Sequence, residues 1–362
     1  MSLNTIQSIL EFVIAFGLLL FIHEFGHFIT ARIQKIEIEE FGFGFPPKLV
    51  KLFTWKGTDF TLNWIPFGAF VRPKGENDPT VPGGLASANP WRRLIVLLGG
   101  PAFNILTGIL LFSILFARIG GPDTKVVQII EVNPGSPAAT ASLDIGDIIR
   151  KVNEQEITST EKIISIVQQN LGKEITITYE RSGKLNDVQI TPRIKPPENE
   201  GALGIVMSNP IVPLTWPQAV PLAFQAAYEQ TVSLISLPGR LIQGQISPDQ
   251  ARMVGPVGMY DIYSQVRNRD IQEAETAPET PAASLNRVAL LAVISIAVGL
   301  TNLFPIPALD GGRILFLLPE LIFRRRVSPK WENMVHFVGF TVLILIMVYV
   351  TSQDITNRIV LP

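Results

Sequence analysis

The chain is 362 residues long; 47% of its residues are hydrophobic and only 17% are charged. Soluble domains carry roughly a quarter charged residues, so this composition, together with a positive mean hydropathy, favours a membrane protein. A formal net charge of −1 gives no reason to expect nucleic acid as a partner, and the lack of cysteine excludes disulfides, thiolate metal sites and cysteine nucleophiles.

The first apolar stretch, residues 6–31, is long enough to span a bilayer, but Glu11 and the sequence HEFGH interrupt it. It does not resemble a cleaved signal peptide, because no basic residue precedes it. On a helix, His23 and His27 project from one face and can bind the same ion, with Glu24 about 100° around the helix. This His-Glu-x-x-His pattern is typical of zinc proteases, in which the imidazoles bind the metal and the carboxylate is the general base.

The alternative is that these three side chains are ordinary core residues satisfied by their neighbours. Unpaired ionisable groups within a membrane span cost several kcal/mol and usually mark a function. We therefore favour the metal site.

Three further windows are apolar enough to span a bilayer: residues 94–117, 285–304 and 335–350. The sequence thus predicts a polytopic α-helical membrane protein with about four transmembrane helices. Residues 1–124 would form its first membrane half and residues 284–362 its second, which ends in a span over about 333–352.

The sequence between the two membrane halves is of a different kind. Residues 125–208 contain short alternating runs such as KVVQIIEV and EITITYE, separated by turns, which predict a small extramembrane domain with several strands. Within residues 209–283, the stretch 221–243 predicts an amphipathic helix that lies at the membrane interface rather than crossing it. Residues 268–284 are rich in Pro, Ala and acidic residues and predict a mobile linker.

Basic residues in short loops predict the orientation in the membrane. Residues 32–93 hold nine of them and residues 313–330 hold five, whereas the first eight residues hold none and the tail after residue 350 holds one. Both basic loops are therefore expected on the cytoplasmic side, with both termini and the extramembrane domain on the opposite side. Four spans satisfy this arrangement and five do not, which supports an interfacial helix over 221–243.

A catalytic zinc site needs a third protein ligand and one open position. In TNLFPIPALDGGR, at the end of the third apolar window, Asp310 is the only acidic residue between residues 285 and 313. The two prolines break the span, and the two glycines allow close backbone approach. We expect Asp310 to be the third ligand, at the same depth as the histidines; the alternative is a cap on the helix after the break. His336 stands alone in the last span and is expected to be buried or interfacial rather than a ligand.

Asn302 is a polar amide in the same apolar window, about two helical turns before Asp310. It is expected to hold the substrate carbonyl or the developing oxyanion. The alternative is a hydrogen bond between helices.

The two motifs together resemble the site-2 protease family, intramembrane zinc metalloproteases that cleave transmembrane substrates. HEFGH matches the first motif of the family, and NLFPIPALDGG matches its Asn-x-x-Pro-x-Pro-x-Leu-Asp-Gly motif. GGPAFN (residues 99–104), WIPFGAFVRP (residues 64–73) and MVGPVGM (residues 253–259) match further segments. The resemblance covers nearly the whole chain and implies an enzyme of the bacterial or plastid type in the bacterial inner membrane or an equivalent one.

The resemblance also implies where substrate binds. The family loop that corresponds to residues 41–75 inserts a β-hairpin into the membrane beside the active site and holds substrate in extended form. The expected substrate-binding residues are Trp64, Ile65, Pro66, Phe67, Gly68, Ala69, Phe70 and Val71 of this loop and Asn104 of the second span.

Residues 125–208 resemble a single PDZ domain of α+β fold. GSPAATASLDIGDIIRKVNEQEI resembles its core, and GALGI resembles its carboxylate-binding loop, placed late as in permuted bacterial PDZ modules. Ser142 and Glu154 stand at turn positions where the family usually has glycine and where φ is often positive. The expected peptide groove is formed by Ala202, Leu203, Gly204 and Ile205.

The sequence therefore predicts a zinc endopeptidase that cleaves single-span transmembrane proteins inside the bilayer, as in regulated intramembrane proteolysis, in some cases after a first cut by another protease. Zinc on the two histidines and Asp310 would activate a water molecule. Glu24 would take its proton, and Asn302 would stabilise the developing oxyanion. Two alternatives are a zinc transporter, which needs a polar path across the membrane, and a membrane scaffold that uses the PDZ domain as an adaptor.

Overall fold

The computed structural model describes residues 3–197, 200–247, 252–276 and 285–361. The chain forms two compact units: unit 1 combines Met1–Leu115 with Trp216–Pro362, and unit 2 is Phe116–Thr215. Unit 2 is thus an insertion between the two halves of unit 1, and it includes the stretch predicted to form an extramembrane domain.

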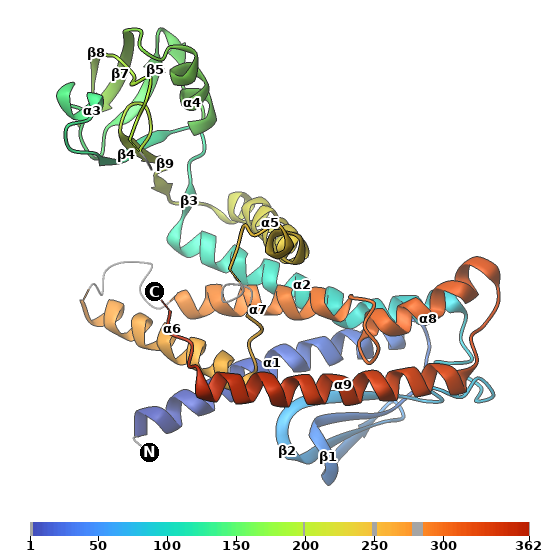
Figure 1. Cartoon of the computed structure of the whole chain (residues 1–362). Helices are drawn as coiled ribbons and strands as arrows, with labels where there is room; N and C mark the ends of the chain where they lie inside the picture. Colours follow the sequence, from blue (N-terminus) through green and yellow to red (C-terminus); the bar gives the residue numbers. More distant parts are fainter. Residues whose placement is uncertain (1–2, 198–199, 248–251, 277–284, 362) are drawn as a thin grey trace. The chain divides into compact units, whose positions relative to one another are not determined.

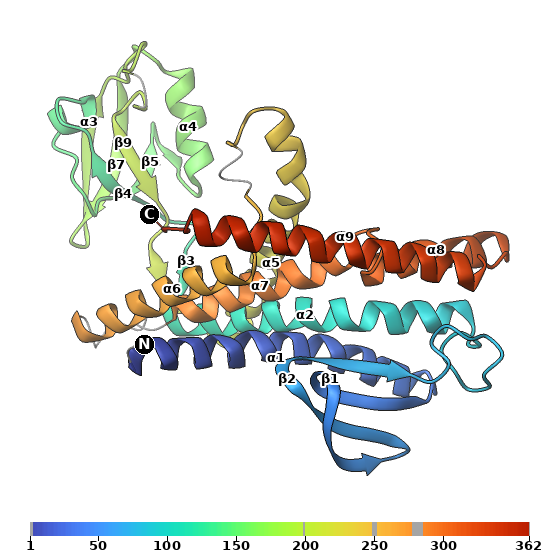
Figure 2. The ribbon, with the colours of Figure 1, turned by 60° about the horizontal axis from the view of Figure 1, so that its bottom comes forward.

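Unit 1 is built mainly from helices, most of which run side by side (Figures 1 and 2). They are α1 (Leu3–Ile33), α2 (Pro90–Ile119), α5 (Trp216–Ile242), α6 (Pro256–Thr276), α7 (Asn286–Asn302), α8 (Asp310–Phe323) and α9 (Pro329–Thr356). Within the described ranges, α1, α2 and α9 are long and apolar enough to cross a bilayer, and α7 is apolar but has only 17 residues. The helix expected over 221–243 lies within α5, which is not one of these three.

The break predicted in the third apolar window separates α7 from α8. Helix α7 ends at Asn302, and α8 begins at Asp310, with the two prolines in the turn between them. A Cβ on Gly311 would overlap the carbonyl oxygens of Leu303 and Phe304, so the turn folds back on the start of α8 as only glycine allows. The break therefore aims the first residue of α8 into the interior of unit 1.

A hairpin of two long strands, β1 (Ile38–Trp55) and β2 (Thr58–Pro73), follows α1 and packs against it (Figure 2). Both strands bend, so residues 40–43 of β1 pair with residues 59–62 of β2 on one side and with residues 69–72 on the other. Among the described residues, the segment 69–72 pairs with no other strand and forms an edge of the sheet.

Aromatic packing fixes this hairpin on α1. Phe41 of β1 is almost fully buried; Phe28 of α1 meets it edge-on with ring centroids 5.5 Å apart, and Phe60 of β2 stacks on it at 5.6 Å. Burying one such side chain contributes about 1.5–3 kcal/mol. The hairpin is thereby held against the helix that carries the histidines.

The mobile linker predicted over 268–284 is wrong in its first part, because α6 continues through it to its end at Thr276; the later residues lie outside the described chain. Two ion pairs tie this helix to its neighbours. Arg267 binds Glu11 of α1 (Nε to Oε2, 2.7 Å), and Asp270 binds an arginine at the start of α7 (2.8 Å). These long-range pairs stabilise a helix where local composition alone indicated a linker.

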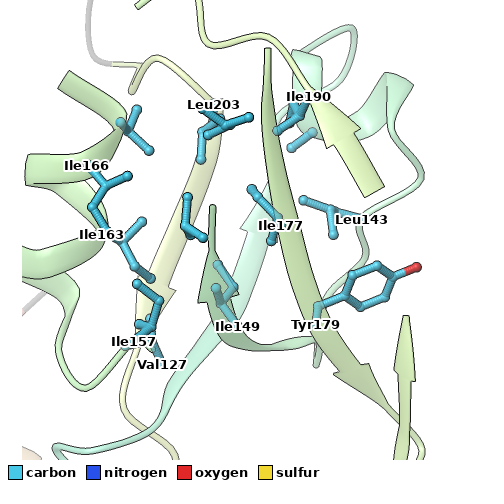
Figure 3. Close-up of a cluster of buried hydrophobic side chains, with 14 of the residues drawn as sticks. Val127, Leu143, Ile149, Ile157, Ile163, Ile166, Ile177, Tyr179, Ile190 and Leu203 are labelled. Atoms are coloured by element: carbon cyan, nitrogen blue, oxygen red, sulfur yellow. The ribbon is translucent and has the colours of Figure 1, made fainter. Parts of the chain in front are cut away.

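Unit 2 contains an antiparallel sheet in the order β8-β7-β5-β4-β9, with β6 paired to β5. Figure 3 shows its core, in which Val127, Ile149 and Ile177 of the sheet meet Ile163 and Ile166 of α4. The elements of this sheet and its two helices are β4 (Val127–Val132), α3 (Pro137–Thr140), β5 (Ile148–Val152), β6 (Gln155–Glu156), α4 (Thr160–Gln169), β7 (Ile175–Arg181), β8 (Lys184–Ile190) and β9 (Ile205–Ser208).

Two turns of unit 2 have the unusual geometry that the sequence indicated. Ser142 and Glu154 adopt φ values of 61° and 62°, at positions where glycine was expected. The sheet forms around them nonetheless.

The entry and exit of unit 2 lie side by side. Short strands β3 (Gly121–Pro122) and β10 (Ile211–Val212) pair with each other in antiparallel fashion. The chain therefore enters and leaves unit 2 at neighbouring points.

Candidate active site

The two histidines of α1 and Asp310 of α8 meet at one point inside unit 1. His23 Nε2 lies 3.1 Å from Asp310 Oδ2 and 3.2 Å from His27 Nε2, and His27 Nε2 lies 3.3 Å from the same Oδ2 atom. All three side chains are mostly buried. The structure thus brings together the three residues that the sequence selected as metal ligands.

The spacing of these donors is that of a zinc site. Zinc bonds to imidazole nitrogen and carboxylate oxygen measure about 2.0–2.2 Å, so two ligand atoms of a tetrahedral site lie about 3.3 Å apart. The three separations of 3.1, 3.2 and 3.3 Å match one face of such a tetrahedron. A zinc ion fits these donors and leaves one position for a water molecule.

Helix α2 packs directly beneath the histidines through two glycines. A Cβ on Gly100 would overlap the Nε2 atoms of both histidines, and one on Gly99 would overlap the Gly26 carbonyl and Thr30 of α1. Small residues permit such close approach of two membrane helices. The GGP sequence therefore brings the backbone of α2 against the site.

The second ring nitrogen of each histidine also faces α2. His27 Nδ1 lies 2.8 Å from the carbonyl oxygen of Val96, so Nδ1–H donates and Nε2 keeps its lone pair. His23 Nδ1 lies 3.3 Å from the side-chain amide of Asn104, which is fully buried. Neither contact was predicted from the sequence.

Asp310 is the first residue of α8, but it does not cap this helix. The N-cap is Leu309, and no side-chain cap hydrogen bond is present. The carboxylate faces the histidines instead, so the capping alternative is wrong.

The loop before Asp310 is held from α9. The backbone N–H of Ala308, a residue with φ of 78°, donates to His336 Nδ1 (2.9 Å). His336 is therefore a brace for the ligand loop and, in the described part of the chain, stands apart from the metal-binding group.

Glu24 lies beside the donor triangle without joining it. Its Oε2 accepts the backbone N–H of Val71 in β2 (3.1 Å). Both residues line a cavity of about 270 Å³, together with the donor residues, Asn302 and Arg313. The cavity is thus lined by a carboxylate, by the three donor residues and by the edge of a strand.

The sequence profile of Peptidase family M50 matches residues 11–346. The chain belongs to peptidase family M50. The zinc metalloprotease RasP of Oceanobacillus iheyensis is 28% identical over 96% of this chain and 98% of its own. The regulator of sigma-W protease RasP of Bacillus subtilis is 26% identical over 97% and 98%. Among solved structures, the PDZ domain of an SdrC-like protein from Listeria monocytogenes is similar at 22% identity over 22% of this chain and 85% of its own, with a TM-score of 0.21.

This M50 peptidase is a zinc metalloprotease of the site-2 type, an integral membrane enzyme that cleaves membrane proteins in regulated intramembrane proteolysis. The function predicted from the sequence is confirmed in this form. The transporter and scaffold alternatives are not supported.

The predicted substrate-binding residues of this M50 peptidase do not all lie at the cavity. Phe70 and Val71 line it. The side chains of Pro66 and Phe67 lie outside the described part of the structure. The cavity lining does not include the other predicted residues, Trp64, Ile65, Gly68, Ala69 and Asn104.

Asn302 lines the cavity of the M50 site, but its side chain is turned back on its own helix. Its Nδ2 donates to the carbonyl oxygen of Val298 (3.0 Å), one turn earlier in α7. Among the described residues, this side-chain amide donates within α7, and the interhelical hydrogen bond considered as an alternative is not seen. Arg313 of α8, which also lines the cavity, pairs with Glu76, which follows β2.

The predicted peptide groove of unit 2 coincides with a cavity of its own. Ala202, Leu203 and Ile205 line about 420 Å³ of mostly apolar space with Ile163 and Val167 of α4. Gly204, within the same segment, adopts a φ of 70°, and a Cβ there would overlap Ser136. The groove is therefore shaped by backbone geometry as well as by apolar side chains.

The groups that orient the ligands were not predicted from the sequence in this role. Val96, Gly100 and Asn104 are spaced four residues apart, which places them on one face of α2. That spacing was readable in the sequence, but the partner of this face was not. The same holds for the contact between His336 and Ala308, which depends on the break between α7 and α8.

Proposed function

We propose that His23, His27 and Asp310 bind one catalytic zinc ion and that Glu24 is the general base for peptide hydrolysis. The observation that carries this proposal is the triangle of donor atoms, with sides of 3.1, 3.2 and 3.3 Å. Glu24 borders the same cavity and has a hydrogen bond to the hairpin rather than to the donors.

When bound, zinc would activate a water molecule and polarise the scissile carbonyl. Glu24 takes a proton from this water and delivers it to the leaving amine. The bond from Val71 N–H holds the carboxylate at the cavity wall. Asn302 turns its amide from Val298 to the developing oxyanion of the substrate.

The substrate binds as an added strand on the edge formed by residues 69–73. Because Val71 N–H points to Glu24 and not to β1, the backbone groups of Val71 face out of the sheet, and those of Ala69 do so by the alternation of a strand. A transmembrane helix that unwinds at this edge recovers partners for its freed backbone groups. Because Glu24 occupies the Val71 N–H within this edge, a strand added along Ala69 and the Val71 carbonyl places the scissile bond beside the catalytic groups.

The substrates in this proposal are single-span membrane proteins, in some cases trimmed beforehand. The basic loops, residues 32–93 and 313–330, face the cytoplasm, and the termini and unit 2 face the opposite side. The groove at Ala202–Ile205 then meets the extramembrane end of a trimmed substrate.

A deletion of unit 2 tests this role. Because β3 and β10 pair where the chain enters and leaves unit 2, the unit can be deleted by joining the residues that flank it. If cleavage of untrimmed and trimmed substrate is unchanged by this deletion, unit 2 does not select trimmed substrates.

The decisive experiment is Glu24→Gln in the full chain, reconstituted with a single-span substrate. The amide keeps an oxygen for Val71 N–H but cannot accept the proton of water, so turnover should fall about 10²–10⁴-fold. Zinc content, measured by elemental analysis, should stay at the wild-type level.

The matched control is Glu39→Gln, the same change at an exposed position of β1. It should leave both turnover and zinc content unchanged. Wild-type turnover in the Glu24 variant would refute its role as base, and loss of zinc would instead make Glu24 a ligand.

A further inference from the structure

One face of α2 carries the groups that touch the two histidines. Val96, Gly100 and Asn104 follow one another at intervals of four residues, so they lie in a row along the helix. The glycine gives room for both imidazoles, and the residues on either side of it supply a polar group to each ring. The row therefore matches the histidine pair in sequence and in space.

The two histidines need the same tautomer to bind a metal through Nε2. For His27 the Val96 carbonyl, an acceptor only, ensures that Nδ1 carries the proton. For His23 the corresponding partner is the Asn104 amide, 3.3 Å from Nδ1. An amide can accept or donate, and its oxygen and nitrogen are assigned from their surroundings.

The surroundings of Asn104 favour an accepting role. Its side chain is fully buried, and its Oδ1 has no hydrogen-bond partner, while Nδ2 is the atom turned towards His23. A donating Nδ2 would require a bare Nδ1, which leaves the proton of a neutral ring on Nε2, where the metal must bind. Exchanging the two ends of the amide places Oδ1 against Nδ1–H and leaves Nε2 of His23 free for the metal.

Asn104 is also fixed in position by its backbone. Ser295 of α7 donates its hydroxyl to the Asn104 carbonyl oxygen (2.7 Å). A Cβ on Gly299, one turn further along α7, would lie 3.2 Å from the Asn104 Cβ. Helix α7 thus presses this residue towards α1.

We infer that Asn104 is a positioning residue for the metal site: its Oδ1 accepts Nδ1–H of His23 and holds that ring in the ligating tautomer and orientation. This inference rests on the proposed role of His23 as a ligand. It replaces the substrate contact expected for Asn104, since a fully buried side chain outside the cavity lining does not reach substrate. Partners of this kind raise metal affinity by about 10–100-fold.

The test compares Asn104→Asp, which keeps an acceptor, with Asn104→Leu, which has the same size and none. Zinc dissociation constants of the full-length detergent-solubilised protein are measured by chelator competition. The leucine variant should bind zinc about 10–100-fold more weakly, and the aspartate variant should bind within a few-fold of wild type or more tightly. Should the leucine variant not fold, Asn104→Ala takes its place with the same expectation.

Two controls keep the outcomes separate. Ser113→Ala removes a buried hydroxyl from another position of α2, which donates to the Ile109 carbonyl of the same helix, and should leave the zinc affinity unchanged. His23→Ala should abolish tight zinc binding; if it does not, the proposed ligand set fails. If it does, and both Asn104 variants bind zinc equally well or equally poorly, the positioning role of Asn104 is refuted while the active site stands.

Discussion

Unit 1 contains two clusters of ionisable side chains, and they differ in how their charges are matched. In one, Glu11 of α1 binds Arg267 of α6 and lies 3.4 Å from Arg287 of α7, which in turn binds Asp270 at 2.8 Å. Every acid there has a base as its direct partner. In the other, at the donor triangle, three acceptors converge, and no Lys or Arg of the described residues pairs with any of them.

The contrast is clearest in two aspartates: Asp270 of α6, which contacts the start of α7, and Asp310, which is the first residue of α8. Asp270 accepts the backbone N–H groups of Asn286 and Arg287 and so covers the exposed start of α7. Asp310 stands at the start of α8, but this helix has no side-chain cap hydrogen bond. A buried acid whose basic and N–H partners are present stabilises the fold; we call such an acid a structural lock. A buried acid that converges with other acceptors is suited to bind a cation.

The largest expected effect separates these two acids by function. Asp310→Asn replaces an anionic ligand with a neutral amide, so zinc affinity and proteolysis should both fall by at least about 10³-fold. Zinc content and cleavage of a single-span substrate are measured on the same preparation. Asp270→Asn is the matched change and should keep its zinc; equal zinc loss in both variants would erase the distinction between the clusters.

The second prediction concerns the free energy of unfolding, in which Asp270→Asn should have the larger effect of the two variants. Asp270→Asn weakens both the cover on α7 and the pair with Arg287, which should lower the free energy of unfolding by about 2 kcal/mol. Chelator-treated protein is compared in a denaturant titration, so that the metal does not contribute. Asp310→Asn should leave this metal-free stability unchanged or raise it, because it removes a buried charge; a loss as large as that of Asp270→Asn would make Asp310 a structural lock as well.

The catalytic cluster could be predicted from the sequence and the structural one could not. His23, Glu24 and His27 share one helical turn, and Asp310 is marked by prolines and glycines beside it, so local spacing carries the signal. Glu11 appeared only as an interruption of an apolar stretch, because its partner Arg267 lies 256 residues away.

The same limit explains the error in the predicted linker. Composition around residues 268–276 indicated disorder, but the segment is helical because Asp270 and Arg267 bind two other helices. The break after the window 285–304 was predictable because Pro305 and Pro307 act locally. The roles of Val96, Asn104 and His336 depend on which helices touch, and no local pattern states that.

A third prediction disturbs the catalytic cluster without removing any donor. Val71→Pro deletes the N–H that holds Glu24, and since this N–H faces away from β1 the sheet keeps its hydrogen bonds. Turnover should fall about tenfold through misplacement of the base, with zinc content unchanged. Ala69→Pro deletes the next outward N–H, which touches no catalytic group; an equal loss there would show that strand addition alone is affected, and no loss in either variant would remove the bond to Glu24 from the mechanism.

The smallest expected effect lies outside both clusters, in unit 2. Ser159 is the N-cap of α4, and its hydroxyl accepts the backbone N–H of Lys162 (3.3 Å), a purely local contact. Ser159→Ala should destabilise unit 2 by about 1 kcal/mol. Native-state hydrogen exchange should show faster opening of α4, with no change in the exchange of α1 or in zinc content. Unit 2 is a compact unit with its own core, so we expect α4 to open independently of α1. A matching change in the exchange of α1 would mean that the two units unfold together. Local stabilising contacts could then not be separated from the metal site.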